Sequence, residues 1–495
     1  MHRVPSHCCL SFAVGALCLG VVADPVYSQG PSAGAQGGAA EATDWNRFRG
    51  PNGTGLATAG SYPAQIGPGK NVVWERPFPG GHSSPVFSAE HLFLTGLDGE
   101  KLYTYALDRR TGETVWKREA PRPRRTEFHA KNYAAAASAA VDDDTVVVFF
   151  DEFGMLAYDH SGEELWRLPM GPFNNIYGMA SSPVMVDDAV VLGCDQQKGS
   201  FVISVAKRTG EVRWKIDRPH SISGHCTPVI YAPAEGNKQV ILPGSYSLDA
   251  YDAETGERIW WINGLPSEMK SVPVLIGETL WIHGYGGPFN DNGKQIELPP
   301  FAEAANEMDK NGDGRIAREE IPNRQVSRWI QFVDPSRDGA LDAEEWVGAR
   351  AFFSAVNVAM ALKVGGNGDV TDENVLWRYY RSIPQLPSPL IFGGAYYLLS
   401  DQGGLLTKLS AESGELVEKG RLEAAVDNYF ASPVGGDGKV YILSESGILT
   451  VLAEGEGFEP IHSVDFDSPC YATPALVDNR VWLRTQDRMF CFGEG

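Results

Sequence analysis

The stretch Ala106-Leu-Asp-Arg-Arg-Thr-Gly-Glu-Thr-Val-Trp116 decides the fold, because close copies of it recur along the chain. Three copies end at Trp166, Trp214 and Trp260, and a fainter copy, Leu409 to Glu415, has lost its Trp. Successive Trp residues of the four full copies lie between 46 and 50 residues apart. A period of this length is typical of repeat architectures. Within each copy, Thr-Gly or Ser-Gly predicts a tight turn between two strands, the second of which carries the Trp.

A second marker precedes each copy and defines the start of a unit. It is a small residue, usually followed by Pro, and then branched apolar residues. The eight occurrences are Ser84-Pro-Val86, Ser138-Ala-Ala-Val141, Ser182-Pro-Val184, Thr227-Pro-Val229, Val272-Pro-Val274, Ser388-Pro-Leu390, Ser432-Pro-Val434 and Thr473-Pro-Ala475. Each is followed by an alternating pattern that predicts further short strands. Eight units of four antiparallel strands predict an all-β fold, an eight-bladed β-propeller over residues 44–495.

The two ends of the repeat region predict how the ring closes. Asn71-Val-Val-Trp74 is a lone Trp strand with no unit in front of it, whereas Thr473 to Phe492 supplies three strands and no Trp strand. We therefore expect Val72–Trp74 to complete the last blade, which removes an open sheet edge.

The first residues predict export. Arg3 is followed by a short apolar core from Cys8 to Gly20, and Val21-Val-Ala23 offers a cleavage site. This pattern is typical of a secretory signal at 1–23, and the Gly-, Ala- and Ser-rich segment 24–43 is typical of a flexible linker. No later run is long and apolar enough for a spanning helix. We expect a periplasmic or secreted protein.

The net charge and the cysteine content limit the kinds of partner and metal site that we expect. The formal net charge of −21 argues against nucleic acid as a partner. No Cys-x-x-Cys pair occurs, so a thiolate zinc site is not expected. Four cysteines would remain after cleavage, and their pairing cannot be read from the sequence: Cys194, Cys226, Cys470 and Cys491. We expect a monomer that binds a protein partner or a small molecule.

The period is interrupted once, by a segment of helical character at about 290–357. It contains two twelve-residue stretches, 309–320 and 334–345, which both match the calcium loop of an EF-hand. In such a loop, oxygen ligands stand at positions 1, 3, 5, 7 and 12, and a Gly at position 6 allows the sharp turn. The predicted calcium ligands are Asp309, Asn311, Asp313, Arg315 (backbone carbonyl) and Glu320 in the first loop, and Asp334, Ser336, Asp338, Ala340 (backbone carbonyl), Asp342 and Glu345 in the second.

The alternative is that both loops are acidic turns that bind nothing. Pro322 and the short distance between Glu320 and Asp334 leave little room for the two helices that join the loops. Basic neighbours such as Lys310 and Arg318 lower the affinity expected for Ca²⁺, and extracellular EF-hands bind it with Kd on the order of 10⁻⁴–10⁻³ M. We expect a structural calcium site and not a switch.

The run Ala-x-Asp-x-x-Thr-Gly-x-x-x-Trp, as in Ala106 to Trp116, resembles the tryptophan-docking motif of propellers built from pyrroloquinoline-quinone-like (PQQ-like) repeats. In that family the Trp stacks against the next blade. The group includes eight-bladed alcohol dehydrogenases and the non-enzymatic propeller lipoprotein of outer-membrane assembly. The Trp45-Asn-Arg-Phe-Arg-Gly-Pro51 opening and the EF-hand insertion are similar to a large secreted bacterial subgroup. The resemblance covers about 44–495 and implies a fold, not a chemistry.

The resemblance allows the sequence to be compared with the residues that hold PQQ in enzymes of the family. Enzymes of the family place adjacent cysteines against the quinone, beside a calcium ion held by Glu, Asn and Asp. The only adjacent pair here, Cys8-Cys9, lies in the expected signal, and no later stretch reproduces the metal segment. The sequence therefore argues against PQQ as a cofactor.

Side chains just before each inner strand are expected to face one mouth of the channel. Those proposed to bind a ligand are His82, His129, Lys131, Asn132, Tyr177, His225, Lys270, Asn428 and Tyr429, with Tyr133, Gln385 and Tyr471 beside them. Such a set suits an anionic or sugar-like ligand. The alternative is a polar, hydrated mouth with no ligand.

Three functions remain open from the sequence. The first is an exported, non-catalytic propeller that binds a partner or ligand, with calcium in its insertion. The second is a quinone-dependent dehydrogenase. The third is another enzyme that acts on a carbohydrate-like ligand at the mouth.

Overall fold

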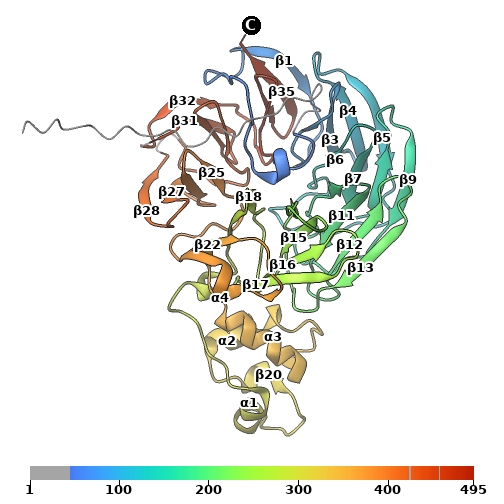
Figure 1. Ribbon diagram of the computed structural model, residues 1–495. Coiled ribbons are helices and arrows are strands. Elements are labelled where there is room, and N and C mark those ends of the chain that lie inside the picture. Colours follow the sequence, from blue (N-terminus) through green and yellow to red (C-terminus); the bar gives the residue numbers. More distant parts are fainter. Residues whose placement is uncertain (1–44, 423–424, 456, 495) are drawn as a thin grey trace, which may run out of the picture. The chain divides into compact units, whose positions relative to one another are not determined.

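A computed structural model of the protein describes residues 45–422, 425–455 and 457–494. All but two of its strands form eight sheets arranged as a ring, each with four antiparallel strands, and the chain passes around the ring in sequence order (Figure 1). The eight-bladed propeller predicted from the repeats is confirmed. The expected signal, 1–23, and the expected linker, 24–43, lie outside the described residues.

The first four blades occupy the sequence between residues 86 and 263. Each contains four consecutive strands, and their order from the axis outward follows the chain. Blade 1 has β2 (Val86–Phe87), β3 (His91–Asp98), β4 (Lys101–Asp108) and β5 (Thr114–Ala120); blade 2 has β6 (Ala140–Val141), β7 (Val146–Phe150), β8 (Gly154–Tyr158) and β9 (Glu164–Pro169); blade 3 has β10 (Val184–Val186), β11 (Ala189–Cys194), β12 (Phe201–Ala206) and β13 (Val212–Asp217); blade 4 has β14 (Val229–Tyr231), β15 (Gln239–Pro243), β16 (Ser247–Asp252) and β17 (Arg258–Asn263).

The last four blades include the two departures from the simple repeat. Blade 5 has β18 (Val274–Ile276), β19 (Thr279–Gly284), β22 (Val358–Lys363) and β24 (Val375–Tyr379); blade 6 has β25 (Leu390–Phe392), β26 (Ala395–Leu399), β27 (Leu405–Ser410) and β28 (Leu416–Arg421); blade 7 has β29 (Val434–Gly436), β30 (Lys439–Leu443), β31 (Ile448–Ala453) and β32 (Pro460–Asp465); blade 8 has β33 (Ala475–Val477), β34 (Arg480–Arg484), β35 (Arg488–Gly493) and β1 (Val72–Pro77). The strand β1 pairs with β35, so the predicted closure by Val72–Trp74 is confirmed.

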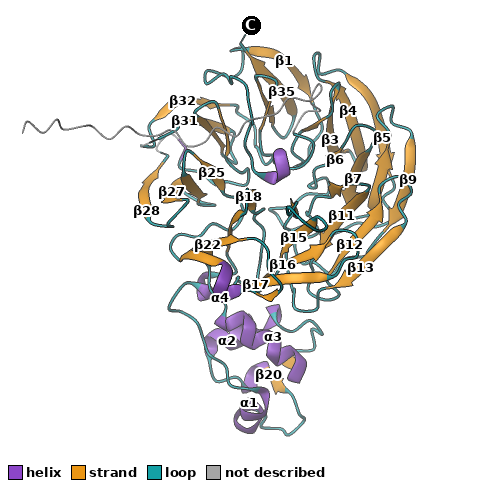
Figure 2. Ribbon diagram, in the orientation of Figure 1, coloured by secondary structure: helices purple, strands orange, loops and turns teal. Residues whose placement is uncertain are grey.

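The insertion lies between the second and third strands of blade 5, and it holds most of the helical residues (Figure 2). Its elements are η2 (Pro288–Asn290), α1 (Phe301–Met308), β20 (Ile316–Ala317), η3 (Arg318–Glu320), α2 (Arg324–Trp329), η4 (Ile330–Phe332), β21 (Ala340–Leu341) and α3 (Ala343–Ser354). Trp346, Phe352 and Phe289 are buried in a core of its own, against which Ile222 and Tyr246 of blade 4 pack. Further along the chain, β23 (Gly368–Asp369) pairs in parallel with β17, and α4 (Thr371–Asn374) follows it.

A belt of hydroxyl groups links the inner strands. In seven of the eight steps around the ring, the backbone N–H of the residue before the Pro position donates to a Ser or Thr hydroxyl of the next blade. The bonds are Ser84 to Ser138, Ser138 to Ser182, Ser182 to Thr227, Val272 to Ser388, Ser388 to Ser432, Ser432 to Thr473 and Thr473 to Ser84, at 2.8–3.1 Å. The step from Thr227 lacks such an acceptor because the equivalent residue is Val272.

Tryptophan docking joins the outer parts of neighbouring blades. The Trp116 ring stacks on Gly162 of the next blade, and its indole Nε1 donates to the carbonyl of His160 at 2.9 Å. Gly162 has φ +81°, and a Cβ there would lie 2.8 Å from the ring, so this turn requires glycine for both reasons. The same contact recurs in four other pairs: Trp74 with Gly112, Trp166 with Gly210, Trp214 with Gly256 and Trp377 with Gly414.

The segment from Trp45 to Ala57 crosses the inner strands near the ring axis, where its short helix η1 (Pro51–Gly53) is the blue helix of Figure 1. The carbonyls of Trp45, Asn46 and Gly55 accept hydrogen bonds from inner strands of blades 1, 2 and 7. The side chain of Asn52 pairs with both backbone groups of Ile230 in blade 4. This plug therefore ties together inner strands that are far apart in the sequence.

None of the helices in the described residues is long and apolar enough to cross a membrane. The four described cysteines are free and buried.

The docking contact predicts that replacing the Trp lowers the stability of the protein more than replacing its exposed neighbour on the same strand. We expect Trp116→Ala to lower the free energy of unfolding by roughly 3 kcal/mol, because it removes a buried ring from a close-packed contact. Val115→Ala, on the same strand but half exposed, should cost less than about 1 kcal/mol. Urea unfolding of both variants measures the difference, and equal losses would show that the stacking on Gly162 contributes nothing special.

Candidate functional site at the channel mouth

One face of the ring carries the loops that precede the inner strands. Because consecutive strands of each blade are antiparallel, the loops between second and third strands open on this same face. We call this face the channel mouth. Its loops before the inner strands are 78–85, 121–139, 170–183, 218–228, 264–273, 380–389, 425–433 and 466–474. The insertion of blade 5 also leaves from this face.

A charged cluster at the mouth is centred on Glu268. The hydroxyl of Tyr177 donates to its carboxylate at 3.0 Å, and the Lys270 ammonium forms an ion pair with the other oxygen. Both side chains of that ion pair are only 9% exposed. The Lys270 ammonium also lies 5.2 Å from the centre of the Tyr177 ring. Burial and the neighbouring Glu268 carboxylate raise the pKa of Tyr177, so its hydroxyl keeps its proton and acts as a donor.

His225 lies beside this cluster and has unused hydrogen-bonding capacity. Its ring is 5.8 Å from the Tyr177 ring, in an edge-to-face arrangement. Both ring nitrogens are buried, and neither has a hydrogen-bond partner among the described residues. A neutral imidazole carries one donor and one acceptor, and buried polar groups are normally satisfied. This histidine is therefore the least satisfied polar side chain of those predicted to face the mouth.

A second, aromatic cluster surrounds His82. Its ring stacks between Tyr471 and Tyr133, with centroids 4.1 and 5.1 Å away. The Tyr471 hydroxyl donates to Glu445 at 3.4 Å, and Asn428 donates to the same carboxylate at 2.9 Å. The predicted residues His82 and Asn428 are thus brought together through residues of blades 7 and 8.

The remaining residues predicted to bind a ligand differ in whether their side chains are exposed, buried or bound to other loops. Asn132 donates to the carbonyls of Tyr177 and Gly178, so it holds the mouth loops in place. The exposed ring of His129 lies 5.3 Å from that of Tyr177. The Lys131 ammonium reaches 5.8 Å from the Phe430 ring, which belongs to a loop several blades away. Tyr429 is fully buried and donates to the carbonyl of Ala425, so its hydroxyl is not offered to a ligand.

Burial sets the charge of the histidines. Desolvation, reinforced by the nearby Lys270 ammonium, lowers the pKa of His225 to about 3. Desolvation and the Arg484 guanidinium lower the pKa of His82 to about 3 as well. Both imidazoles are therefore neutral near pH 7, and among the residues predicted to bind a ligand the positive ones are Lys131 and Lys270.

Sequence reasoning missed three residues that complete these clusters, namely Glu268, Phe430 and Glu445. The only available signal for Glu268 was its place two residues before Lys270 in a loop already assigned to the mouth. Glu445 comes from a loop between second and third strands, a class of loop that was not considered. Phe430 is apolar, and polar residues alone were sought.

The two candidate calcium loops have the turns that their sequences predict. Asp309 accepts backbone N–H bonds from Gly312 and Gly314, and Asp334 accepts them from Arg337 and Gly339. The loops pair through β20 and β21, with Ile316 opposite Leu341. The other predicted ligands, Asn311, Asp313, Ser336, Asp338, Ala340 and Asp342, lie on these same turns, and Glu320 and Glu345 close them.

Across the described residues, the mouth and both loops included, no group of three or more His, Cys, Asp or Glu side chains converges as a metal centre would require. The four described cysteines are free, and no two of them are adjacent in the sequence. The described residues therefore do not reproduce the adjacent cysteines that the family resemblance places against a quinone.

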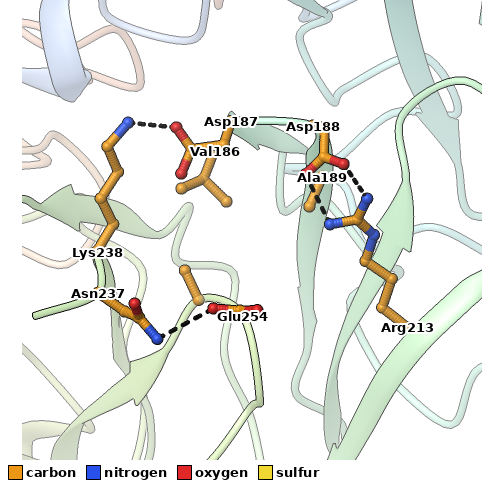
Figure 3. Close-up of a pocket in the computed structure, with 9 residues that line it drawn as sticks. Val186, Asp187, Asp188, Ala189, Arg213, Asn237, Lys238 and Glu254 are labelled. Carbon is orange, nitrogen blue, oxygen red and sulfur yellow. Dashed lines mark hydrogen bonds and ion pairs between the residues drawn. The ribbon is translucent and has the colours of Figure 1, made fainter.

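A separate polar cleft of about 310 Å³ lies between blades 3 and 4. Figure 3 shows that its charged side chains are already paired, Lys238 with Asp187 and Arg213 with Asp188. Asn237 also donates to Glu254. Because Lys238 and Arg213 each have a carboxylate partner, the cleft offers no unpaired cation to a ligand.

The fold and the mouth define an eight-bladed β-propeller with clusters of polar and aromatic side chains on one face and an inserted helical module. A family model described as outer membrane protein assembly factor BamB, a PQQ-like repeat model, matches residues 64–228 and 103–274. The expected PQQ-like repeats are therefore confirmed.

Solved structures share the fold at low identity. BamB from Moraxella catarrhalis is 10% identical with a TM-score of 0.54, and the alignment covers 86% of this chain and 97% of that one. A europium-containing methanol dehydrogenase is 11% identical with a TM-score of 0.54, covering 92% and 98%. Quinohemoprotein alcohol dehydrogenase from Comamonas testosteroni is 12% identical with a TM-score of 0.51, covering 91% and 81%. No curated protein sequence matches the chain significantly. Likeness at this level establishes the fold alone.

The depressed pKa of His225 predicts a pH effect on stability. Below pH about 6.5 an unfolded histidine binds a proton, whereas the folded His225 stays neutral down to about pH 3. The free energy of unfolding should therefore fall as the pH drops from 7 to 5. In His225→Gln this fall should be smaller by up to about 1.4 kcal/mol per pH unit. Denaturant unfolding of both proteins at the two pH values measures it, and identical slopes would contradict the assignment.

Proposed function

We propose that this protein is an exported, non-catalytic propeller that binds a ligand or a partner's polar group at the channel mouth, with calcium bracing its insertion. The observation that carries the proposal is the pair of unsatisfied nitrogens on buried His225, next to the Lys270, Glu268 and Tyr177 cluster. A bound hydroxyl or carboxylate would supply the missing hydrogen bonds. Such a site fits a small anionic or carbohydrate-like ligand.

The comparisons support a binding role without naming a ligand. The matching family model is described as an outer membrane protein assembly factor, and that description suits a protein whose partner is another envelope protein. The expected signal at 1–23 supports a periplasmic or secreted location. The mouth offers both aromatic and charged side chains, which is typical of binding surfaces.

A quinone-dependent dehydrogenase is the alternative, since two of the similar structures are named as alcohol or methanol dehydrogenases. The lack of adjacent cysteines among the described residues weighs against it. Another enzyme acting on a carbohydrate-like ligand would use the same mouth, with Glu268 as its candidate acid or base. Because Glu268 is held by Tyr177 and Lys270, it is better placed to orient a ligand than to exchange protons.

We also propose that the loops 309–320 and 334–345 bind Ca²⁺. Each loop begins with an Asp whose carboxylate caps the turn and ends with a Glu that folds back to backbone N–H groups. Each carboxylate oxygen keeps a further lone pair, and the amide, hydroxyl and backbone oxygens of the turn are the hard ligands that calcium prefers. Bound calcium would supply charge neutralisation at these turns.

Arg315 lowers the affinity expected for the second loop. Its guanidinium donates to the Asp338 carboxylate and to the Ala340 carbonyl, and it lies 3.5 Å from Glu345. A cation entering this loop would have to displace it. This contact supports a weak, structural role for calcium.

Binding at the mouth is tested by replacing His225 with a side chain of similar size. We expect one or more of a panel of neutral sugars and sugar acids to raise the melting temperature of the wild type. His225→Phe should lower the affinity for that ligand about tenfold, because one neutral hydrogen bond is worth up to roughly 1.5 kcal/mol. Isothermal titration measures the affinities.

The matched control is Arg110→Met, which changes an exposed residue of the turn between β4 and β5, on the face of the ring opposite the mouth, and should leave the affinity unchanged. If no panel member binds, or if both variants lose affinity alike, the mouth is not the site. Reduction of a dye by the protein mixed with PQQ, Ca²⁺ and an alcohol would instead establish the dehydrogenase.

Calcium binding is tested on the full chain. We expect titration with millimolar Ca²⁺ to give heat and to raise the melting temperature. Glu345→Gln should remove the second site, because the last loop position supplies two oxygens, whereas Glu344→Gln, the exposed neighbour, should not. Absence of heat from the wild type, or equal loss in both variants, would leave the loops as acidic turns.

A further inference from the structure

A groove of about 990 Å³ lies between blades 5 and 6, away from the residues assigned to the mouth clusters. One wall is formed by the end of β24 and the residues that follow it, Arg378 to Ile383. The other is formed by the turn at Gly414 and the start of β28, with Leu416 and Lys419. Tyr285 and Asp291, at the beginning of the insertion, close one end.

The groove carries positive charge that the protein does not neutralise. Arg378, Arg381 and Lys419 form no ion pair with any carboxylate of the described residues, and the Lys419 ammonium donates only to the Ser382 hydroxyl, at 2.7 Å. These three cations line one groove in a chain whose formal net charge is −21. The cleft between blades 3 and 4 is the internal comparison, since there each cation has a carboxylate partner (Figure 3).

The acidic lining residues do not cancel this charge. The Asp291 carboxylate is already shared by Lys294, at 2.8 Å, and by the side chain of Asn357. Glu415 lies on the turn before β28 and is exposed to solvent. Two guanidinium groups and an ammonium therefore remain available to an incoming anion.

The same groove exposes apolar surface. Leu416 is 53% exposed and Tyr380 is 37% exposed, and both line it. Val417, next to Leu416 on β28, is 59% exposed. Apolar side chains of this size beside unpaired arginines are typical of protein-binding surfaces, and neither a free phosphate nor a polyphosphate chain would use them.

The strands that wall the groove can accept another strand. Each of β24 and β28 is the last strand of its sheet among the described residues, so its outer backbone groups have no strand partner. In blade 4 the chain itself supplies an added strand, because β23 pairs in parallel with the outer strand β17 at Trp260 and Trp261. An extended peptide can be held at such an edge by main-chain hydrogen bonds, with side chains giving specificity.

We propose that the groove between β24 and β28 binds an extended acidic segment of a partner protein. Carboxylates of the segment would pair with Arg378, Arg381 and Lys419, and alternating apolar side chains would cover Leu416 and Tyr380. The arginines suit this role because a guanidinium binds a carboxylate through two parallel hydrogen bonds. The proposal does not depend on a ligand at the mouth or on calcium.

The test uses the full chain and a fluorescein-labelled peptide of about twelve residues that alternates Glu with Val, followed by fluorescence anisotropy at low ionic strength. We expect saturable binding that weakens as salt is added. The double variant Arg378→Glu and Arg381→Glu should lower the affinity at least about tenfold. Tyr380→Ser should lower it several-fold while keeping the salt dependence, since it removes contact area and no charge.

The matched control is the double variant Arg110→Glu and Lys198→Glu, which makes the same change in net charge at two exposed residues outside the groove. It should keep the affinity within about twofold, because distant exposed charges are screened. Circular dichroism and the melting temperature check that each variant is folded.

Three results would overturn the proposal. The first is no saturable binding of the Glu–Val peptide by the wild type. The second is an equal loss of affinity in the groove and control variants, which would mean non-specific attraction. The third is that an oligomer of glucuronic acid binds the groove while the peptide does not, which would make the occupant an acidic glycan.

Discussion

The ring depends on one hydrogen bond repeated seven times, from the backbone N–H before each inner strand to a hydroxyl of the next blade. The Pro that usually follows has no N–H, so it leaves no unpaired donor at the inner edge of the sheet, where no further strand can pair with it. The sequence marker Ser-Pro-Val therefore identifies the residues that join the inner strands of neighbouring blades. It fixes the start of each blade and hence the position of every mouth loop that precedes it.

Tryptophan docking joins the outer strands of neighbouring blades, and other contacts replace it where the Trp or its glycine is missing. Between blades 4 and 5, Trp260 has no turn glycine to stack on; it donates to Gln239 and is covered by the added strand β23. Between blades 6 and 7, Glu418 stands where the Trp would be, and buried Lys408 donates to the carbonyls of Gly455 and Gly457. Between blades 7 and 8, His462 stands where the Trp would be, and its Nε2 lies 2.6 Å from the carbonyl oxygen of Ile66.

Much of the fold was accessible from the sequence, because its determinants are local and repeated. The turn glycines and the Trp positions identified the outer joint, and the lone strand ending at Trp74 identified the closure. The mouth was predicted less completely. Position before an inner strand does not determine where a side chain ends: Tyr429 turns inward to Ala425, whereas Lys131 reaches Phe430 several blades away. These outcomes depend on packing between loops distant in the chain, which no periodicity encodes.

The buried arginines show how the ring satisfies its axis without carboxylates. Arg47 and Arg49 of the plug donate to the carbonyls of Pro228 and Pro389, at the inner strands of blades 4 and 6, and desolvation lowers the pKa of each to about 9. Arg218, equally buried beneath the mouth, is instead held by Asp195 and Asp249, and its pKa is raised.

The arginines of the plug bind carbonyls and Arg218 binds carboxylates because different groups need a hydrogen-bond partner at the two places. The inner-strand carbonyls face the axis, where there is no adjacent strand, and a guanidinium with five donors can reach several of them at once. A carboxylate beside these carbonyls would be repelled. The plug thus satisfies the axis from within the chain, while the arginines of the groove between blades 5 and 6 remain exposed, where a partner can reach them.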